Sequence, residues 1–164
     1  MLSLGLFMAA ANCATEADAA TILRNEYTQP TASCQGAVPA HEGKLRKRPL
    51  AIANESAETA FVSCGLTMSQ GESPNGSYYV YVVLTNRGAV SATVNCTLVE
   101  GYAGFGSRYH PKSVTLEPGE TDDTFAWSWA DNNFMALAYP AISCALPPGV
   151  EINGVVRQFN ETVS

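Results

Sequence analysis

Apolar and polar residues alternate with a period of two along most of the chain, the pattern of strands that bury one face. Turn signals separate the alternating stretches, among them Asn86-Arg87-Gly88, Pro118-Gly119 and Pro147-Pro148-Gly149. The expected strands are Pro49–Ala53, Thr59–Leu66, Ser77–Thr85, Val90–Val99, Lys112–Leu116, Thr124–Trp129, Met135–Leu146 (broken by Pro140) and Glu151–Phe159. The sequence therefore predicts an all-β protein, an antiparallel β-sandwich of the jelly-roll or immunoglobulin-like kind with about seven to eight strands.

Two of these stretches have an unusual distribution of apolar residues. Tyr78–Leu84 is apolar on both faces, which indicates a strand in the centre of a sheet. Thr124–Trp129 places Phe125, Trp127 and Trp129 on one face and only small residues on the other. Aromatic residues at alternate strand positions usually face the core, whereas an exposed row would form a platform for a ligand. The pattern alone leaves both interpretations of the tryptophans open.

The first nineteen residues have the features of a secretory signal peptide. Met1–Ala11 is a short apolar run that ends in small residues, and Ala17-Asp18-Ala19 fits an A-x-A cleavage site. No Lys or Arg precedes the run, and the alternatives are cleavage after Ala9–Ala11, lipid attachment at Cys13, or a buried N-terminal helix. Residues 20–45 are weakly patterned and are expected to form an irregular arm, so that residues 46–164 make up the sandwich domain.

The composition favours export and excludes some partners. Charged residues make up 15% of the chain, below the roughly 25% usual in globular domains, and the formal net charge is −6. An acidic protein has no general attraction for phosphate backbones, so nucleic acid is not expected as a partner. No apolar stretch long enough for a transmembrane span follows the N-terminus. A secreted or periplasmic protein is expected, with an extracellular protein or a polysaccharide as its partner, and the oligomeric state stays open.

Five cysteines are present, and four remain if Cys13 is removed with the signal peptide. An even number in an exported chain predicts two disulfides, for which three connectivities exist. The preferred pairing is Cys96 with Cys144 and Cys34 with Cys64. Cys96 and Cys144 each lie on the apolar face of an alternating stretch, so they are expected to meet through the sandwich core. The alternative is that some cysteines are free and buried; metal binding is disfavoured because no C-x-x-C pair occurs.

Three short motifs carry a resemblance to a known group of proteins. They are Asn54-Glu55-Ser56 leading to Val62-Ser63-Cys64, then Cys96-Thr97-Leu98, then Cys144-Ala145-Leu146-Pro147-Pro148. In this order they resemble the N-x-S…V-x-C, C-T-L and C-x-x-P-P pattern of small uncharacterised secreted bacterial β-sandwich proteins. The resemblance covers about residues 48 to 158, and Gly65 stands where the group often has proline. It implies export and a β-sandwich, and it implies no activity.

An aromatic, glycine-rich loop is the main candidate for ligand binding. Gly101–Tyr109 combines flexible glycines with the side chains Tyr102, Phe105, Arg108 and Tyr109. Flat aromatic faces suit the C–H-rich faces of sugars, and Arg108 would add a polar contact. Trp127 and Trp129 would extend this platform if their face were exposed. The loop is not followed by a helix, so it does not match a phosphate-binding loop.

Two clusters of charge are further candidates. Glu117, Glu120, Asp122 and Asp123 surround a Pro-Gly turn, and their oxygen atoms could hold Ca²⁺, the one cofactor considered. The spacing does not match a known calcium loop, and the alternative is a solvated turn. Lys44–Arg48 holds four of the nine basic residues and could contact an anionic polysaccharide, lipid headgroups or a processing protease. Its alternative is a solvated edge strand, because basic edges deter pairing between molecules.

No catalytic motif is present. The chain has two histidines, His41 and His110, and no G-x-S-x-G sequence. A nucleophile, a base and an acid would have to be assembled from scattered residues such as Ser107, His110 and Asp123. The first hypothesis is therefore an exported, non-enzymatic module with a structural or protein-contact role. The second is a carbohydrate-binding module that uses the aromatic loop, and the third is a secreted enzyme or protease inhibitor.

Overall fold

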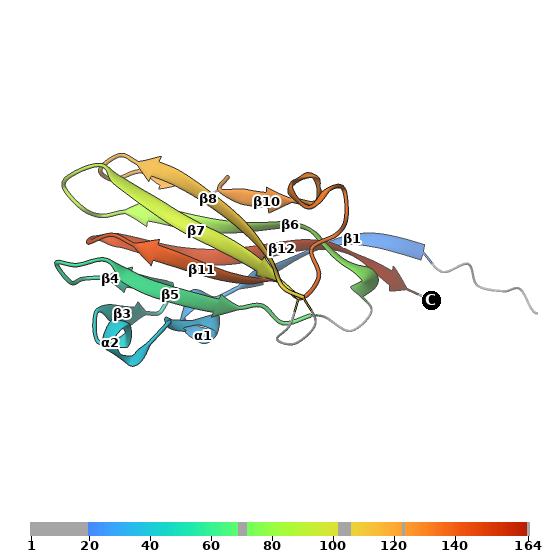
Figure 1. The fold of residues 1–164 in the computed structure, drawn as a ribbon, viewed down its shortest axis with the longest axis horizontal. Helices are drawn as coiled ribbons and strands as arrows, with labels where there is room; N and C mark the ends of the chain where they lie inside the picture. Colours follow the sequence, from blue (N-terminus) through green and yellow to red (C-terminus); the bar gives the residue numbers. More distant parts are fainter. Residues whose placement is uncertain (1–19, 69–71, 102–105, 123, 164) are drawn as a thin grey trace, which may run out of the picture.

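The computed structural model describes residues 20–68, 72–101, 106–122 and 124–163, and it is an antiparallel β-sandwich (Figure 1). One sheet has five strands in the order β2 (Cys34–Gly36), β5 (Ala60–Gly65), β11 (Ala141–Leu146), β7 (Ala92–Glu100) and β8 (Arg108–Leu116). The predicted fold class is confirmed. The number of strands among the described residues is larger than expected, because the nine-residue β1 and three short strands, β2, β3 and β9, add to the eight alternating stretches.

The other sheet has seven strands. Its main order is β10 (Ala126–Ser128), β6 (Glu72–Asn86), β12 (Val150–Val163), β4 (Ala51–Asn54) and β3 (Leu45–Arg48). β1 (Ala20–Thr28) also pairs with β12, and β9 (Thr121–Asp122) also pairs with β6. The short helices are α1 (Pro30–Ser33), α2 (Pro39–Glu42) and the 3₁₀ helix η1 (Trp129–Asn132). No helix in the described part of the chain has the length and apolar content that a membrane span requires.

Residues 20–45 are not an irregular arm, which corrects the expected domain boundary. Ala20–Thr28 forms β1 and pairs with β12 from Val155 to Val163 without interruption. Cys34–Gly36 forms β2, an edge strand of the five-stranded sheet. The two short helices in this region, α1 and α2, each begin with a proline. The sequence pattern did not predict β1, because an edge strand that is exposed over most of its length does not need alternating apolar residues. The sandwich therefore includes these residues.

The core lies between the two sheets and is formed by the alternate apolar residues that the sequence predicted. The largest fully buried apolar side chains include Trp127, Ile52, Leu84, Leu98 and Leu116. Tyr78–Leu84 lies in β6, between β12 on one side and β9 and β10 on the other, which confirms the central position expected from its two apolar faces. Met135–Leu146 is a strand only from Ala141 onward, after the break at Pro140.

Both disulfides connect neighbouring strands of the five-stranded sheet. Cys34 is opposite Cys64 on β2 and β5, and Cys144 is opposite Cys96 on β11 and β7, with Cα–Cα distances of 4.0 Å in both pairs. This is the predicted pairing. The predicted route was wrong, because the Cys96–Cys144 bridge joins two strands of one sheet and does not cross the core to the other sheet.

Two buried asparagines fasten the chain where it passes from one sheet to the other. Asn54 ends β4, and its Nδ2 donates to the carbonyl of Leu146 on β11 at 2.7 Å. Asn86 ends β6, and its Nδ2 donates to Leu116 of β8 at 3.1 Å and to Val90 at 2.8 Å. Each Oδ1 accepts a backbone N–H two residues later, from Ser56 and Gly88 respectively. An asparagine thus links the two sheets at both of these connections, β4 to β5 and β6 to β7.

Replacing Asn86 by alanine is expected to lower the free energy of unfolding by about 2 kcal/mol, because it leaves the buried Leu116 carbonyl, the Val90 carbonyl and the Gly88 N–H without this partner. Urea unfolding of the Asn86→Ala variant measures the loss. Asn95→Ala is the control, since Asn95 is exposed on β7 and should change stability by less than about 0.5 kcal/mol. Equal stabilities for both variants would show that the corner contact is not stabilising.

Candidate functional site

Three aromatic rings line an open groove beside the seven-stranded sheet. Tyr78 comes from β6, Trp129 begins η1, and Phe134 follows it in the segment between β10 and β11. The ring centroids of Tyr78 and Trp129 are 6.4 Å apart and those of Trp129 and Phe134 are 5.4 Å apart, each pair nearly perpendicular. With Met135 and Ala136 they enclose about 480 Å³, and we call this feature the aromatic groove.

The aromatic groove exposes two adjacent apolar rings to solvent. Phe134 is 70% exposed and Trp129 is 39% exposed. Single exposed apolar residues are ordinary, whereas adjacent exposed rings around a depression are typical of binding surfaces. The groove is therefore the strongest candidate site among the described residues.

The backbone of this segment is held in an unfavourable conformation. Asn133 has φ 53°, Phe134 has φ 61° and Tyr139 has φ 50°. Asparagine tolerates the left-handed region, but bulky side chains such as Phe and Tyr enter it at a cost of about 1–2 kcal/mol per residue. Such conformations persist only where the surroundings impose them, and they concentrate at functional positions. The exposed ring of Phe134 is thus held in place by its neighbours.

A buried carboxylate provides much of that support. Glu100 lies at the end of β7 with only 5% of its side chain exposed. Its Oε2 accepts hydrogen bonds from Asn132 Nδ2 at 2.9 Å and from the backbone N–H of Ala138 at 3.2 Å. Its Oε1 lies 3.1 Å from Arg108 Nη1 and 3.7 Å from His110 Nε2. Glu100 therefore fixes both sides of the segment that carries Phe134.

The same segment is also attached to β6. Ser77 and Leu137 form an isolated β-bridge, in which each backbone N–H donates to the other carbonyl at 2.8–2.9 Å. Gly76, at φ 83°, precedes this bridge, and a Cβ at that position would come within 2.5 Å of the Leu137 carbonyl oxygen. The bridge therefore needs glycine at position 76. Together with Glu100 it makes the aromatic groove a preformed surface.

Helix η1 begins with a capping box that orients Trp129. Asp131 Oδ2 accepts hydrogen bonds from the backbone N–H of Ser128 at 2.7 Å and from its hydroxyl at 3.1 Å. Lys112 of β8 lies 3.0 Å from the same carboxylate. Partial burial alone would raise the pKa of Asp131, but the hydrogen bonds from Ser128 and Lys112 outweigh it and hold this pKa below its ordinary value. The ionised form is thus the one that the folded protein stabilises.

The stabilising effect of Asp131 is expected to disappear in acid. A carboxylate whose pKa is lower in the folded state stabilises the fold above its ordinary pKa, and this contribution is lost as the pH falls through the lowered folded value. At pH 7 the Asp131→Asn variant should be less stable than the unchanged protein by about 1 kcal/mol. Unfolding at pH 7 and at about pH 2–3 measures both proteins, with the difference expected to shrink in acid. A difference independent of pH would contradict this role.

The structure separates the residues predicted for the aromatic platform. Trp127 is fully buried in the core, where its ring packs against Phe125 and its Nε1 donates to the His110 carbonyl at 2.6 Å, so it cannot contact a ligand. Trp129 is the one tryptophan that reaches the surface. Arg108 supports the aromatic groove through Glu100 and Asn132. Tyr109 is exposed on β8, and Tyr102 and Phe105 lie outside the described residues.

Sequence reasoning missed Tyr78, Phe134 and Glu100. One signal for part of this site was present, because Ser128-Trp129-Ala130-Asp131 has the spacing of a capping box and predicts that the strand ends before Trp129. No local signal could have found Glu100, since its partners are 32 and 38 residues away. Asp131 and Asn132 end η1 and Asn133 is its C-cap, and no local pattern marks them as the support of an exposed ring.

The acidic residues do not form a metal site in the described part of the chain. Glu117 accepts from Ser91 Oγ, Glu120 accepts from the Glu117 N–H, and Asp122 accepts from the N–H and hydroxyl of Thr124. Each carboxylate thus serves a local turn, and no group of three or more His, Cys, Asp or Glu side chains is close enough to hold an ion among these residues. Asp123 lies outside the described residues.

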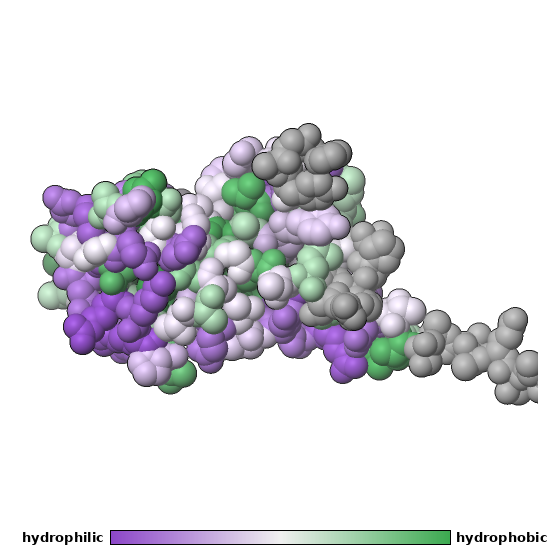
Figure 2. Space-filling view, turned by 90° about the horizontal axis from the view of Figure 1, so that it is seen from below, coloured by the Kyte–Doolittle hydropathy of each residue, from purple (hydrophilic) through white to green (hydrophobic). Residues whose placement is uncertain are grey.

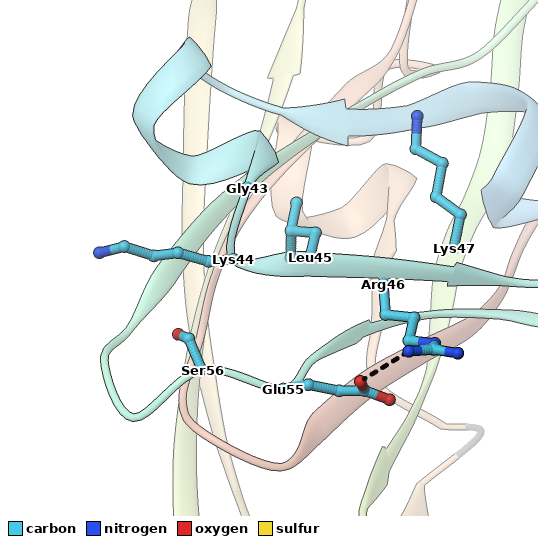
Figure 3. A pocket seen from close by; sticks show the side chains of 7 residues that line it. All are labelled: Gly43, Lys44, Leu45, Arg46, Lys47, Glu55 and Ser56. Carbon is cyan, nitrogen blue, oxygen red and sulfur yellow. Dashed lines mark ion pairs between the residues drawn. The ribbon is translucent and has the colours of Figure 1, made fainter.

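Arg46, Lys47 and Arg48 lie on the edge strand β3, Lys44 directly precedes it, and these charges are largely neutralised. Figure 3 shows Arg46 turned toward Glu55, with Lys44 and Lys47 pointing away from them. Lys44 pairs with Glu58, Lys47 with Glu42, and Arg48 with Glu55. The hydrogen bond from Arg48 holds the pKa of Glu55 below its ordinary value. In Figure 2 hydrophilic residues gather over this end of the molecule. This arrangement fits best with the interpretation of Lys44–Arg48 as a solvated edge strand.

The scattered residues considered for catalysis are not assembled. The ring of His110 faces Glu100, with a separation of 3.7 Å, and its Nε2 is buried. Ser107 is exposed before β8, and Asp123 lies outside the described residues. Among the described residues the buried His110 Nε2 has no hydrogen-bond partner, so no nucleophile is hydrogen-bonded to it there.

Comparison with known proteins gives distant matches of fold. No protein-family model matches the chain, and no curated protein matches it significantly. A solved carbohydrate-binding module, CBM4, aligns with 85% of this chain and 86% of its own at 6% identity, with a TM-score of 0.36. TmCBM61 in complex with β-1,4-galactotriose aligns with 85% of this chain and 87% of its own at 10% identity, with a TM-score of 0.33.

Proposed function

We propose that this β-sandwich is a non-catalytic module that binds a carbohydrate polymer in the aromatic groove. The observation that carries the proposal is the ring of Phe134, which is 70% exposed on a left-handed backbone next to the half-exposed Trp129. Both the exposure of the apolar ring and the left-handed backbone of Phe134 lower the stability of the fold. A binding role offers a reason for keeping such a residue. We thus place the carbohydrate-binding surface in the segment between β10 and β11, and not in the loop Tyr102–Tyr109 that the sequence suggested.

The chemistry of the groove suits a sugar chain. The C–H-rich face of a pyranose ring is apolar and can pack on the flat face of Trp129 or Phe134, while its hydroxyl groups need polar partners at the rim. Tyr78 supplies a hydroxyl that already accepts from Asn160 Nδ2 at 3.1 Å. Because the neighbouring rings are nearly perpendicular, they form a stepped wall and not one flat platform. This shape favours a single bent or twisted chain over the flat face of a crystal.

The groove is rigid before any ligand arrives. Glu100, the Ser77–Leu137 bridge and the Ser128–Asp131 cap hold its walls at separate points. Rigid walls reduce the entropy lost on binding, which raises affinity without adding contacts. Sugar binding in water is weak for each contact, so preorganisation of this kind would matter more here than in a dry apolar pocket.

Removing either exposed ring is expected to weaken binding about tenfold, the effect of losing roughly 1.4 kcal/mol of contact. The variants are Trp129→Ala and Phe134→Ala, tested by retention on insoluble cellulose, chitin, xylan and galactan. Phe61→Ala is the matched control, because Phe61 is an exposed aromatic residue on β5 in the other sheet. Tyr109→Ala tests the loop that the sequence favoured, and we expect it to bind like the unchanged protein.

Two results would count against carbohydrate binding at this groove. Retention of Trp129→Ala and Phe134→Ala at the level of the unchanged protein would place any sugar contact elsewhere. No retention of the unchanged protein on any polymer would favour the structural or protein-contact role that the sequence also predicts.

An exported location is part of the proposal. Two buried disulfides fit an oxidising compartment outside the cytoplasm, where such bonds persist. We also propose that the chain belongs with the small secreted β-sandwich proteins that share its cysteine motifs. This is supported by the positions of Cys64, Cys96 and Cys144, which lie on the adjacent strands β5, β7 and β11.

A further inference from the structure

The edge strands of this sandwich differ in how they are protected against pairing. In the five-stranded sheet, β2 has only three residues, and β8 contains Pro111 and Lys112. In the seven-stranded sheet, β9 has two residues and β10 has three, and β3 is the basic strand Leu45–Arg48. Short edges, proline and positive charge are all devices that deter pairing with another molecule. Each of these edges therefore carries at least one of them.

β1 is the exception. It has nine residues, contains no proline, and keeps a regular register with β12 from Ala20 to Thr28 without a bulge. Its one basic residue, Arg24, forms an ion pair with Glu161 of β12, so this charge is balanced within the chain. Within the described residues β12 is the single strand with which it pairs, so its other edge presents backbone groups outward. Leu23 is 55% exposed and Tyr27 is 54% exposed. A long, regular edge with exposed apolar side chains is a template for another strand.

β1 is firmly placed in the sheet. Glu26 forms an ion pair with the fully buried Arg157 of β12, and Arg24 lies 2.6 Å from Glu161. The hydroxyl of Tyr27 donates to the carbonyl of Asn153 at 2.7 Å. The outer edge is therefore preformed, and a partner strand would add to an existing ladder (Figure 1).

The sequence of β1 is complementary to itself in one antiparallel register. If Asn25 lies opposite the same residue of a second copy, Arg24 faces Glu26, and Leu23 faces Tyr27. Opposite charges and aromatic–aliphatic pairs both stabilise neighbouring strands. If the pairing is centred one residue earlier or later, Arg24 lies opposite Arg24 of the second copy, or Glu26 lies opposite Glu26. Like charges directly opposite each other are unfavourable. Arg24 and Glu26 also keep their ion pairs with Glu161 and Arg157 of β12, so the register about Asn25 is the one that adds no contact between like charges.

We propose that β1 is a dimer interface, in which two copies pair edge to edge about Asn25 and join their seven-stranded sheets into one. The occupant is a second copy and not an unrelated strand, because the charge pattern of β1 fits its own reverse. The contact uses backbone hydrogen bonds along Ile22–Thr28 for affinity and the side chains on either side of Asn25 for register. It is independent of the aromatic groove and of any sugar.

Analytical ultracentrifugation of the full chain over a range of concentrations tests the interface. We expect a reversible dimer, and we expect Leu23→Lys to raise its dissociation constant at least tenfold by placing a charge beside the two-fold axis. Val90→Lys is the matched control, because Val90 is an exposed residue in the turn before β7, and it should leave the dissociation constant unchanged.

A cysteine scan tests the register. Asn25→Cys should form a disulfide-linked dimer under mild oxidation, since the two positions face each other across the axis. Ser113→Cys, on the protected edge strand β8, should not. A monomer at every concentration would overturn the proposal. So would a dimer that Leu23→Lys leaves intact, or one in which Ser113→Cys cross-links as readily as Asn25→Cys.

Discussion

Replacing Cys96 and Cys144 together by alanine is expected to lower the free energy of unfolding by about 4 kcal/mol. The bond closes a loop with a sequence separation of 48, and in the chain-entropy description its loss releases the unfolded chain by this amount. Both residues lie on the inner face of adjacent strands, so the bond holds β7 and β11 in register directly beneath the core. This is a large part of the total stability of a domain of this size.

Guanidinium unfolding of the double variant, compared with the unchanged protein, measures the loss. The Cys34→Ala/Cys64→Ala variant is the companion, with an expected loss of about 3.5 kcal/mol for its separation of 30. A Cys96→Ala/Cys144→Ala variant as stable as the unchanged protein would mean that this bond does not constrain the fold. Mass spectrometry after partial proteolysis checks the pairing independently.

Replacing Glu100 by alanine is expected to cost about 3 kcal/mol in stability and to weaken polysaccharide binding. The variant leaves Asn132 Nδ2 and the Ala138 N–H without their charged acceptor in a buried place. Because those groups fix the segment around Phe134, the aromatic groove should loosen before the sandwich unfolds. Glu100 is a positioning residue in this account, and it does not contact the sugar.

The conservative change Glu100→Gln separates positioning from mere loss of stability. Glutamine keeps an acceptor of the same shape, so it should retain part of the binding that Glu100→Ala loses. Glu117→Ala is the control, since Glu117 is exposed in a turn and should change stability by less than about 0.5 kcal/mol. If Glu100→Ala bound polysaccharide as tightly as the unchanged protein, the aromatic groove would not depend on this carboxylate.

The strands of the sandwich could be predicted because a buried face leaves a period of two in the sequence. The prediction failed where that requirement is absent. β1 lies at an edge and is exposed along most of its length, so no alternation marks it. The route of the Cys96–Cys144 bond failed for another reason: alternation gives the face of a residue but not the order of strands, and β7 and β11 are neighbours only in the folded sheet.

The candidate site was only partly predictable. The alternation of Phe125, Trp127 and Trp129 predicted that all three aromatic residues lie on one face of a strand. The strand in fact ends at Ser128, and η1 begins at Trp129. Trp127 consequently enters the core and Trp129 reaches the surface. Tyr78 and Phe134 meet across more than fifty residues of chain, which periodicity cannot reveal. The position of the groove is therefore a property of the topology.

The two tryptophans make one measurement decisive for carbohydrate binding at the aromatic groove. Trp129 lines the groove, whereas Trp127 is buried and its Nε1 donates to the His110 carbonyl, so their indole NMR signals report on different places. The chain is titrated with soluble oligosaccharides from cellulose, chitin, xylan and galactan. The account predicts that at least one of them shifts the Trp129 indole signal and leaves that of Trp127 unchanged. An unchanged Trp129 signal with every oligosaccharide would contradict it.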